Sequence, residues 1–271
     1  MAKKKRKKKI KLKKRRAKPK KGKKKKIPKR KKRETKKTTI KASFKQTKDS
    51  DGNLVFKVSK NWSKEAYINK NQYEKKYKLS IKENENFWRK EGKRITWIKP
   101  YTKIKDVKYS KDDVHIKWYH DGTLNASANC IDRHLKKNKD KTAIIWVGDD
   151  PKVQKKISYK QLHNEVCKTA NAFKDIGIKK GDRVTIYLTM IPELAITMLA
   201  CARIGAIHSI IFGGFSPDSI AGRINDCKSD YVVTADEGVR GGKTIPLKAT
   251  TDEALSNCPD VKKCIVVKRT G

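Results

Sequence analysis

Beyond residue 141 the sequence alternates between short β-rich runs and longer segments with helical spacing, and this alternation constrains the fold most. Strands are predicted at 142–147, 181–188, 208–212, 231–235 and 262–267, and helices at 158–177, 191–206, 216–227 and 246–258. Strand–helix–strand crossovers of this length are right-handed and join parallel strands, so helices come to cover both faces of one sheet. The sequence therefore predicts an α/β domain built on a mostly parallel sheet.

Local signals support several of the helix boundaries. Gly177 stands where a C-cap belongs after the apolar-periodic run 158–177. The segment 191–206 is almost wholly apolar and has Pro192 in its first turn, so we expect it to be buried against the sheet. Ser216 is an N-cap residue at the start of 216–227.

The charge of the chain is concentrated at its amino-terminal end. The formal net charge is +43, and residues 1–50 hold 29 of the 71 lysines and arginines against only Glu34 and Asp49. This segment has few apolar residues to bury, so we predict that it is disordered. Polybasic segments bind polyanions by counterion release, which leaves RNA, DNA and an anionic lipid surface open as partners. A purely solvating extension, or one misjoined to the domain, is the alternative.

Residues 51–75 are interpreted as a transition, with a turn at DSDGN, and a new texture begins near residue 76. There the spacing of Ser80 and Glu83 predicts a capping box that opens a short helix, which carries Trp88. The tryptophans of this region are predicted to anchor a core, with a stacking platform for single-stranded nucleic acid as the alternative.

Metal and nucleophile motifs are not predicted. The six cysteines form no C-x-x-C pair, and several lie in apolar patterns, which is typical of buried thiols in a reducing compartment such as the cytoplasm. No Ser-His-Asp or Cys-His arrangement can be assigned, so we name no catalytic residue and no metal ligand. No apolar run reaches the length of a membrane span or forms a secretory signal, so a soluble protein is expected.

Two glycine-bearing loops follow predicted strands, at the strand ends where α/β sheets bind ligands. In the first, Phe212 ends a strand, and Gly213 and Gly214 would let a ligand approach the backbone.

The second loop, ADEGVRGGK, places Arg240 and Lys243 around Gly241 and Gly242. One guanidinium fork and one ammonium could converge on phosphates while the backbone amides stay reachable. Plain turn chemistry is the alternative for both loops, because the chain contains neither a P-loop nor a dinucleotide-binding glycine motif.

Longer strings extend this interpretation. The chain resembles the amino-terminal part of AMP-forming acetyl-coenzyme A synthetases, of the adenylate-forming acyl-CoA ligase superfamily, in WYHDGTLNASANCIDRHL (118–135), AIIWVGDD (143–150), SYKQLHNEVC (158–167), MLACARIGAIHSIIFGGFSPDSIAGRI (198–224) and TADEGVRGGKTIPLK (234–248). The resemblance runs from about residue 75. It implies a family-specific cap region at 76–140 and the first part of the AMP-binding domain at 141–271, and it leaves the basic segment unmatched.

The resemblance implies a two-step reaction. Acetate and MgATP would give acetyl-AMP and pyrophosphate, and the thiol of coenzyme A would then displace AMP. The loop from Val239 to Lys243 would contact the phosphorylated nucleotide end of coenzyme A, and the loop from Phe212 to Gly214 would line the pantetheine channel. Many relatives have arginine where this chain has Lys243, and proline where it has Thr189.

The family's ATP loop, acetate pocket, magnesium carboxylate and catalytic lysine would all follow Gly271. We therefore expect an amino-terminal fragment that is inactive alone. The alternative function is a nucleic-acid-binding protein that acts through residues 1–50.

Overall fold

The structure, a computed structural model, describes residues 46–271 in two compact units that divide after Tyr67. The described part of the first unit consists of β1 (Gln46–Lys48), β2 (Leu54–Phe56) and α1 (Lys60–Glu65). The turn predicted at DSDGN is confirmed, since Asp49 Oδ1 accepts the backbone N–H of Asn53 at 2.8 Å. Residues 1–45, to which the predictions of disorder and polyanion binding mainly apply, lie outside the described residues. For residues 46–48, which form β1, the prediction of disorder is wrong.

The second unit begins with α2 (Lys70–Lys82), α3 (Asn84–Glu91) and the 3₁₀ turn η1 (Gly92–Arg94). The predicted capping box at Ser80 and Glu83 is wrong, because Ser80 lies inside α2 and its hydroxyl donates to the Tyr77 carbonyl at 2.8 Å. A capping box forms instead at Asn69 and Gln72, where α2 begins. The S-x-x-E spacing also occurs within helices, so it cannot fix a start by itself.

The tryptophans of this region do not anchor the core, which corrects the sequence-based expectation. Trp88 is 36% exposed and Trp118 is 40% exposed, and their rings meet edge to face with centroids 5.6 Å apart. Trp97 is half-buried and donates from Nε1 to the Gly92 carbonyl at 2.8 Å. These rings join α3 and η1 to the hairpin of β3 (Lys105–Tyr109) and β4 (Val114–Trp118), which has no apolar layer of its own to bury them.

Two short helices connect this region to the α/β core. They are the π-helical turn η2 (Ala128–Asp132) and α4 (Arg133–Asn138). Ile131 is fully buried in the main core, and Asp132 forms an ion pair with Arg203. The Asn125 side chain donates to the Ala202 carbonyl at 3.0 Å, so a partly buried amide also holds the two regions together.

The core is a four-stranded parallel sheet, as predicted. Its strands are β7 (Arg183–Leu188), β8 (Ile207–Phe212), β9 (Tyr231–Ala235) and β12 (Lys263–Val267), in the order β12-β9-β7-β8. β7 and β9 are buried at nearly every position, which explains their continuous apolar sequences. β8 lies at the edge and leaves Ile207, Ile210 and Phe212 exposed.

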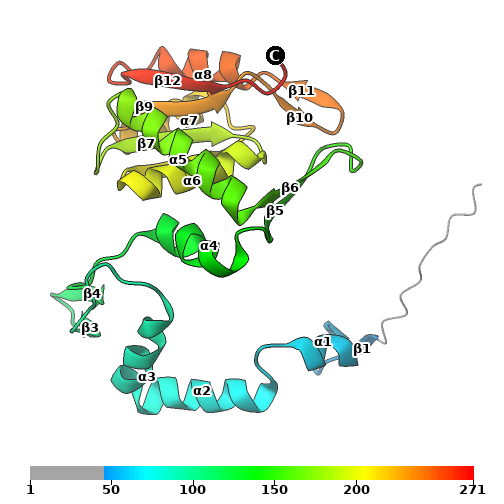
Figure 1. The fold of residues 1–271 in the computed structure, drawn as a ribbon, viewed down its shortest axis with the longest axis vertical. Helices are drawn as coiled ribbons and strands as arrows, with labels where there is room; N and C mark the ends of the chain where they lie inside the picture. Colours follow the sequence, from blue (N-terminus) through cyan, green and yellow to red (C-terminus); the bar gives the residue numbers. More distant parts are fainter. Residues whose placement is uncertain (1–45) are drawn as a thin grey trace, which may run out of the picture. The chain divides into compact units, whose positions relative to one another are not determined.

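Helices cover both faces of this sheet, which confirms the α/β prediction (Figure 1). On one face α5 (Tyr159–Asp175) packs on α6 (Pro192–Ile204), and on the other α7 (Pro217–Asp226) packs on α8 (Leu247–Leu255). The apolar residues at helical spacing in α5 are all buried, and Gly205 ends α6 with a left-handed φ of +79°.

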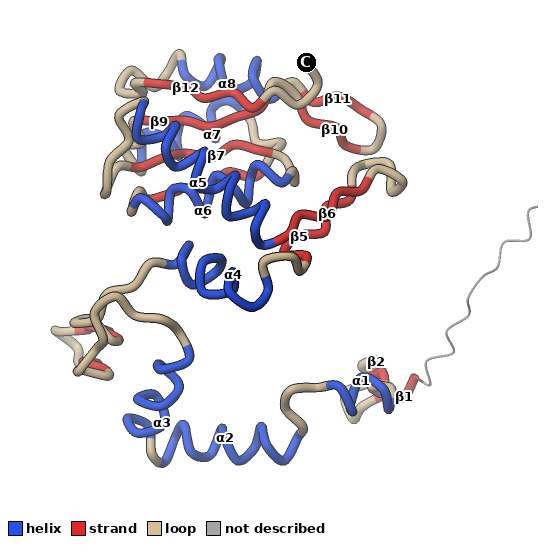
Figure 2. Tube along the Cα trace, in the orientation of Figure 1, coloured by secondary structure: helices blue, strands red, loops and turns tan. Residues whose placement is uncertain are grey.

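The first predicted strand does not join the parallel sheet. β5 (Thr142–Val147) pairs antiparallel with β6 (Gln154–Ser158), a strand that the sequence analysis missed. The two strands are joined by only six residues, which allows a hairpin and excludes a helical crossover. Figure 2 shows this two-stranded arm beside a second missed hairpin, β10 (Gly238–Arg240) and β11 (Lys243–Ile245).

None of the helices between residues 46 and 271 has the length and apolar character needed to cross a membrane.

Candidate functional site

The carboxyl ends of β7, β8 and β9 meet at one edge of the sheet, where the chain turns to opposite faces. After β7 it enters α6 on one face, whereas after β9 it leads to α8 on the other. Such a reversal between adjacent strands leaves a crevice where open α/β sheets bind ligands. Both glycine loops of the sequence analysis lie at this edge, together with the loop that begins at Thr189.

The loop after β8 keeps its backbone open by conformation. Gly214 has φ +126°, a value that other residues rarely adopt, and a side chain there would meet no atom within 4 Å. The backbone N–H of Gly214 donates to the buried Tyr187 hydroxyl at 3.1 Å, and this hydroxyl donates to the Phe215 carbonyl at 3.3 Å. Phe212 is 61% exposed beside this loop. The buried Tyr187 hydroxyl therefore holds the loop in place, while the space around Gly214 stays open.

Thr189 fills the crevice between the loops, a position to which the sequence analysis gave no role. A Cβ on Gly238 would lie 2.6 Å from Thr189 Cγ2, and a Cβ on Gly213 would lie 3.3 Å from the same methyl group. The approach at Gly238 is too close for any side chain, whereas Gly213 packs tightly against the same threonine side chain. The only sequence signal was the pair of glycines itself.

The loop after β9 forms the β10–β11 hairpin, whose two-residue turn is Gly241-Gly242. Their φ values of +59° and +73° fit a type I′ turn, which requires positive φ at both central positions. Arg240 and Lys243 are the register partners that flank this turn, and both are exposed. Directly opposed residues of an antiparallel pair project from the same face of the hairpin.

The two cations have no partner within the described residues. Between residues 46 and 271 no ion pair or side-chain hydrogen bond involves Arg240 or Lys243. A cavity of about 590 Å³ adjoins the same loop but is lined by other residues, namely Asp236, Glu237, Pro246, Lys248, Ala249, Asp252, Thr270 and Gly271. The cations are therefore exposed on the hairpin rather than enclosed in this cavity.

The backbone amides of the turn are not free, contrary to the expectation that they stay reachable. Gly241 and Gly242 both donate to the carboxylate of Asp149, at 2.7 Å to Oδ1 and 2.7 Å to Oδ2. These donors, Gly242 first, hold the pKa of Asp149 below its usual value. The contact spans 92 residues, so no local pattern could have predicted it.

Asp236, the first residue after β9, has a structural role. Burial alone would raise its pKa, but backbone N–H donors from Gly271, Arg269, Glu237 and Thr270 outweigh burial and lower it. This carboxylate fixes the start of the loop against the segment 269–271, which follows β12.

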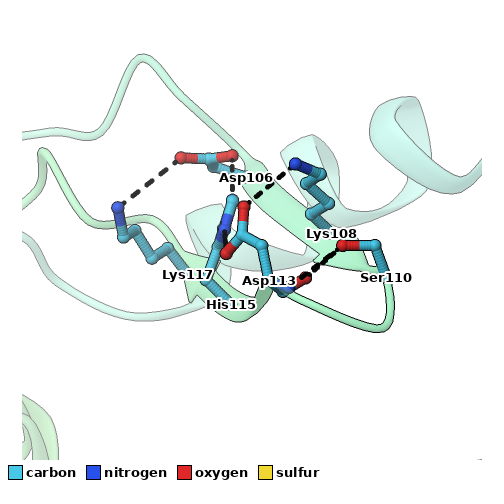
Figure 3. Close-up of polar contacts among 6 residues, drawn as sticks. All are labelled: Asp106, Lys108, Ser110, Asp113, His115 and Lys117. Carbon is cyan, nitrogen blue, oxygen red and sulfur yellow. Dashed lines mark hydrogen bonds and ion pairs between the residues drawn. The ribbon is translucent and has the colours of Figure 1, made fainter.

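A second polar cluster lies on the β3–β4 hairpin (Figure 3). His115 is 2.9 Å from Asp106 through Nε2 and 3.2 Å from Asp113 through Nδ1. Lys108 and Lys117 complete the network with ion pairs of 3.0 Å to Asp113 and 3.8 Å to Asp106. Every member lies on the two strands or their turn, so the network holds the hairpin closed.

Comparison with known proteins identifies the protein family of this chain. Residues 131–271 match the family described as AMP-binding enzyme, and the chain belongs to that family. Residues 73–130 match the family described as acetyl-coenzyme A synthetase N-terminus.

Curated relatives place the chain more narrowly. It is 62% identical over 217 residues to an acetyl-coenzyme A synthetase of Parvibaculum lavamentivorans and 59% identical over 220 residues to one of Shewanella sediminis. Each alignment covers 80% of this chain and 34% of the relative, so the chain spans about a third of their length.

A solved structure shares the fold. Acetoacetyl-CoA synthetase from Streptomyces lividans superposes with a TM-score of 0.66 at 22% identity, over 78% of this chain and 32% of that chain.

Proposed function

We propose that the chain supplies the coenzyme A-binding edge of an AMP-forming acetate–CoA ligase. In that reaction acetate and ATP give acetyl-AMP, and coenzyme A then takes the acetyl group. Arg240 and Lys243 would contact the phosphates at the nucleotide end of coenzyme A, and Phe212, Gly213 and Gly214 would line the path of its pantetheine arm. The family membership and the names of the relatives support this assignment.

The observation that carries the proposal is the position of the two cations. Arg240 and Lys243 are directly opposed across β10 and β11, and neither is neutralised within the described residues. Like charges in this position destabilise an antiparallel pair. An anion with several phosphate groups would remove that repulsion, and the nucleotide end of coenzyme A carries a 3′-phosphate and a diphosphate.

The loop after β8 suits the uncharged part of the same ligand. Its backbone is uncovered at Gly214, and Phe212 offers an exposed apolar ring next to it. A narrow apolar and amide-bearing chain such as pantetheine can lie against both.

The other ligands of the reaction have no assigned residues here. Between residues 46 and 271 no group of three or more His, Cys, Asp or Glu side chains could hold a metal ion, so we derive no step from Mg²⁺. ATP and acetate belong to the proposal only as substrates of the complete reaction. A cytoplasmic location is likewise proposed from the free cysteines.

Calorimetric titration of the chain with coenzyme A tests the proposal. Lys243→Ala should weaken binding about tenfold, the effect of losing one charge-assisted phosphate contact. Lys168→Ala is the matched control, because Lys168 is an exposed lysine on α5 that pairs with Glu165. Equal affinities for the unaltered chain and both variants would contradict the proposed function.

A further inference from the structure

The carboxylate of Asp149 occupies the turn that separates the two proposed phosphate-binding cations. It accepts one hydrogen bond from each of the Gly241 and Gly242 amides, both at 2.7 Å. These are the central residues of the turn. Their positive φ values direct both N–H groups toward one carboxylate. Two consecutive amides that hold one anion form the kind of nest that would otherwise accept a phosphate.

Asp149 is itself held at the tip of a braced hairpin. It lies between β5 and β6, where the Gly148 amide donates to the Val153 carbonyl at 2.7 Å. On β5, Trp146 donates from Nε1 to the Met190 carbonyl at 2.8 Å, and Arg269 stacks on its ring at 5.1 Å. The arm is therefore tied to the loop that follows β7, at the same sheet edge as the glycine loops (Figure 1).

We propose that Asp149 is a positioning residue for coenzyme A binding: it fixes the Gly241-Gly242 turn so that Arg240 and Lys243 face the ligand together. This inference rests on the proposed function. Because the carboxylate already fills the amide nest, the phosphates are bound by the two side chains and not by the backbone. A fixed turn also removes the ordering cost that a mobile hairpin would add to binding.

Plain turn chemistry does not require this contact. A Gly-Gly type I′ turn forms without a side-chain partner, whereas here a residue 92 positions away supplies the acceptor. Both bonds of Asp149 go to the backbone amides of the turn, so the carboxylate fixes the turn without pairing with either cation.

The test is a double-mutant cycle with Asp149→Ala, Asp149→Asn and Arg240→Ala, read by coenzyme A calorimetry and by hydrogen exchange of the turn amides. Asp149→Ala should weaken binding about tenfold and speed exchange at Gly241 and Gly242 about tenfold or more. Asp149→Asn keeps one acceptor oxygen, so it should have an intermediate effect. In the Arg240→Ala background, Asp149→Ala should add less than threefold, because it acts through the cations.

Asp150→Ala is the matched control in the same hairpin tip. Asp150 accepts the Lys152 amide at 2.9 Å and does not bond to the glycine turn, so its loss should leave both readouts unchanged. If Arg240→Ala weakens binding but Asp149→Ala does not, the positioning role is overturned and the proposed function stands. If the unaltered chain binds no coenzyme A, the proposed function fails. In that case equal exchange at Gly241 and Gly242 with and without Asp149 overturns the turn-fixing role as well.

Discussion

Arg240 and Lys243 are register partners across the β10–β11 hairpin, so a guanidinium and an ammonium project from one face of a two-residue turn. Neither has a charge partner among residues 46–271. A folded chain maintains such an arrangement at a cost to its own stability, which points to an anionic ligand.

Neutralising one cation should stabilise the chain while ligand is absent. Lys243→Gln removes the opposed like charge, and we expect a gain of about 0.2–1 kcal/mol in the free energy of unfolding. Thermal denaturation at low ionic strength measures it, with Lys168→Gln as the control, since that variant loses a pair with Glu165. A loss of stability in Lys243→Gln at low salt would show that the pair is not repulsive.

Restoring a second guanidinium should tighten coenzyme A binding. Lys243 presents a point charge, whereas arginine can donate to two phosphate oxygens at once. Lys243→Arg should therefore raise the affinity about threefold to tenfold in calorimetry. An unchanged or weaker affinity would mean that position 243 does not contact phosphate.

The packing of Gly238 against Thr189 predicts a specific rescue. Gly238→Ala places a Cβ 2.6 Å from Thr189 Cγ2, so it should cost about 1–3 kcal/mol of stability. Thr189→Ala in the same chain should recover much of that loss. Gly222→Ala in α7 is the control, because a Cβ there meets nothing within 4 Å and should stabilise the helix slightly. If the double variant is as unstable as the sum of the single variants, the steric account fails.

The β3–β4 hairpin should lose stability as the pH rises above 6.5. Hydrogen bonds to Asp106 and then Asp113 raise the pKa of His115 above its ordinary value of 6.5. The stabilisation is fully present below pH 6.5, where His115 is charged in the folded and unfolded chains, and is lost as pH rises through the raised folded pKa. An NMR titration of His115 checks this. A midpoint at or below 6.5 would contradict it.

The parallel sheet and its helices were predictable because each element carries its own period. The apolar spacing in α5 and the apolar strands β7 and β9 follow from burial that every βαβ unit shares. The partner of β5 was not predictable in the same way. A short β-rich run such as β5 fits either a sheet or a hairpin, and only the six-residue connection to β6 decides between them.

The site was predictable only in part, for a related physical reason. The sequence places Arg240 and Lys243 around two glycines, but their pairing depends on a hairpin of three-residue strands that has no periodic signal. The bond from Asp149 to the turn joins residues 92 positions apart, and Thr189 became informative only beside Gly213 and Gly238. Long-range contacts of this kind are set by the fold and not by local sequence.

The most direct measurement compares coenzyme A with coenzyme A that lacks its 3′-phosphate, by calorimetry. The unaltered chain should prefer coenzyme A by about tenfold or more. The control variant Arg94→Ala, which removes an exposed arginine paired with Glu91, should keep that preference. Arg240→Ala should lose most of it, because the phosphate no longer meets the guanidinium. An Arg240→Ala variant that discriminates between the two ligands as well as the unaltered chain would contradict the account.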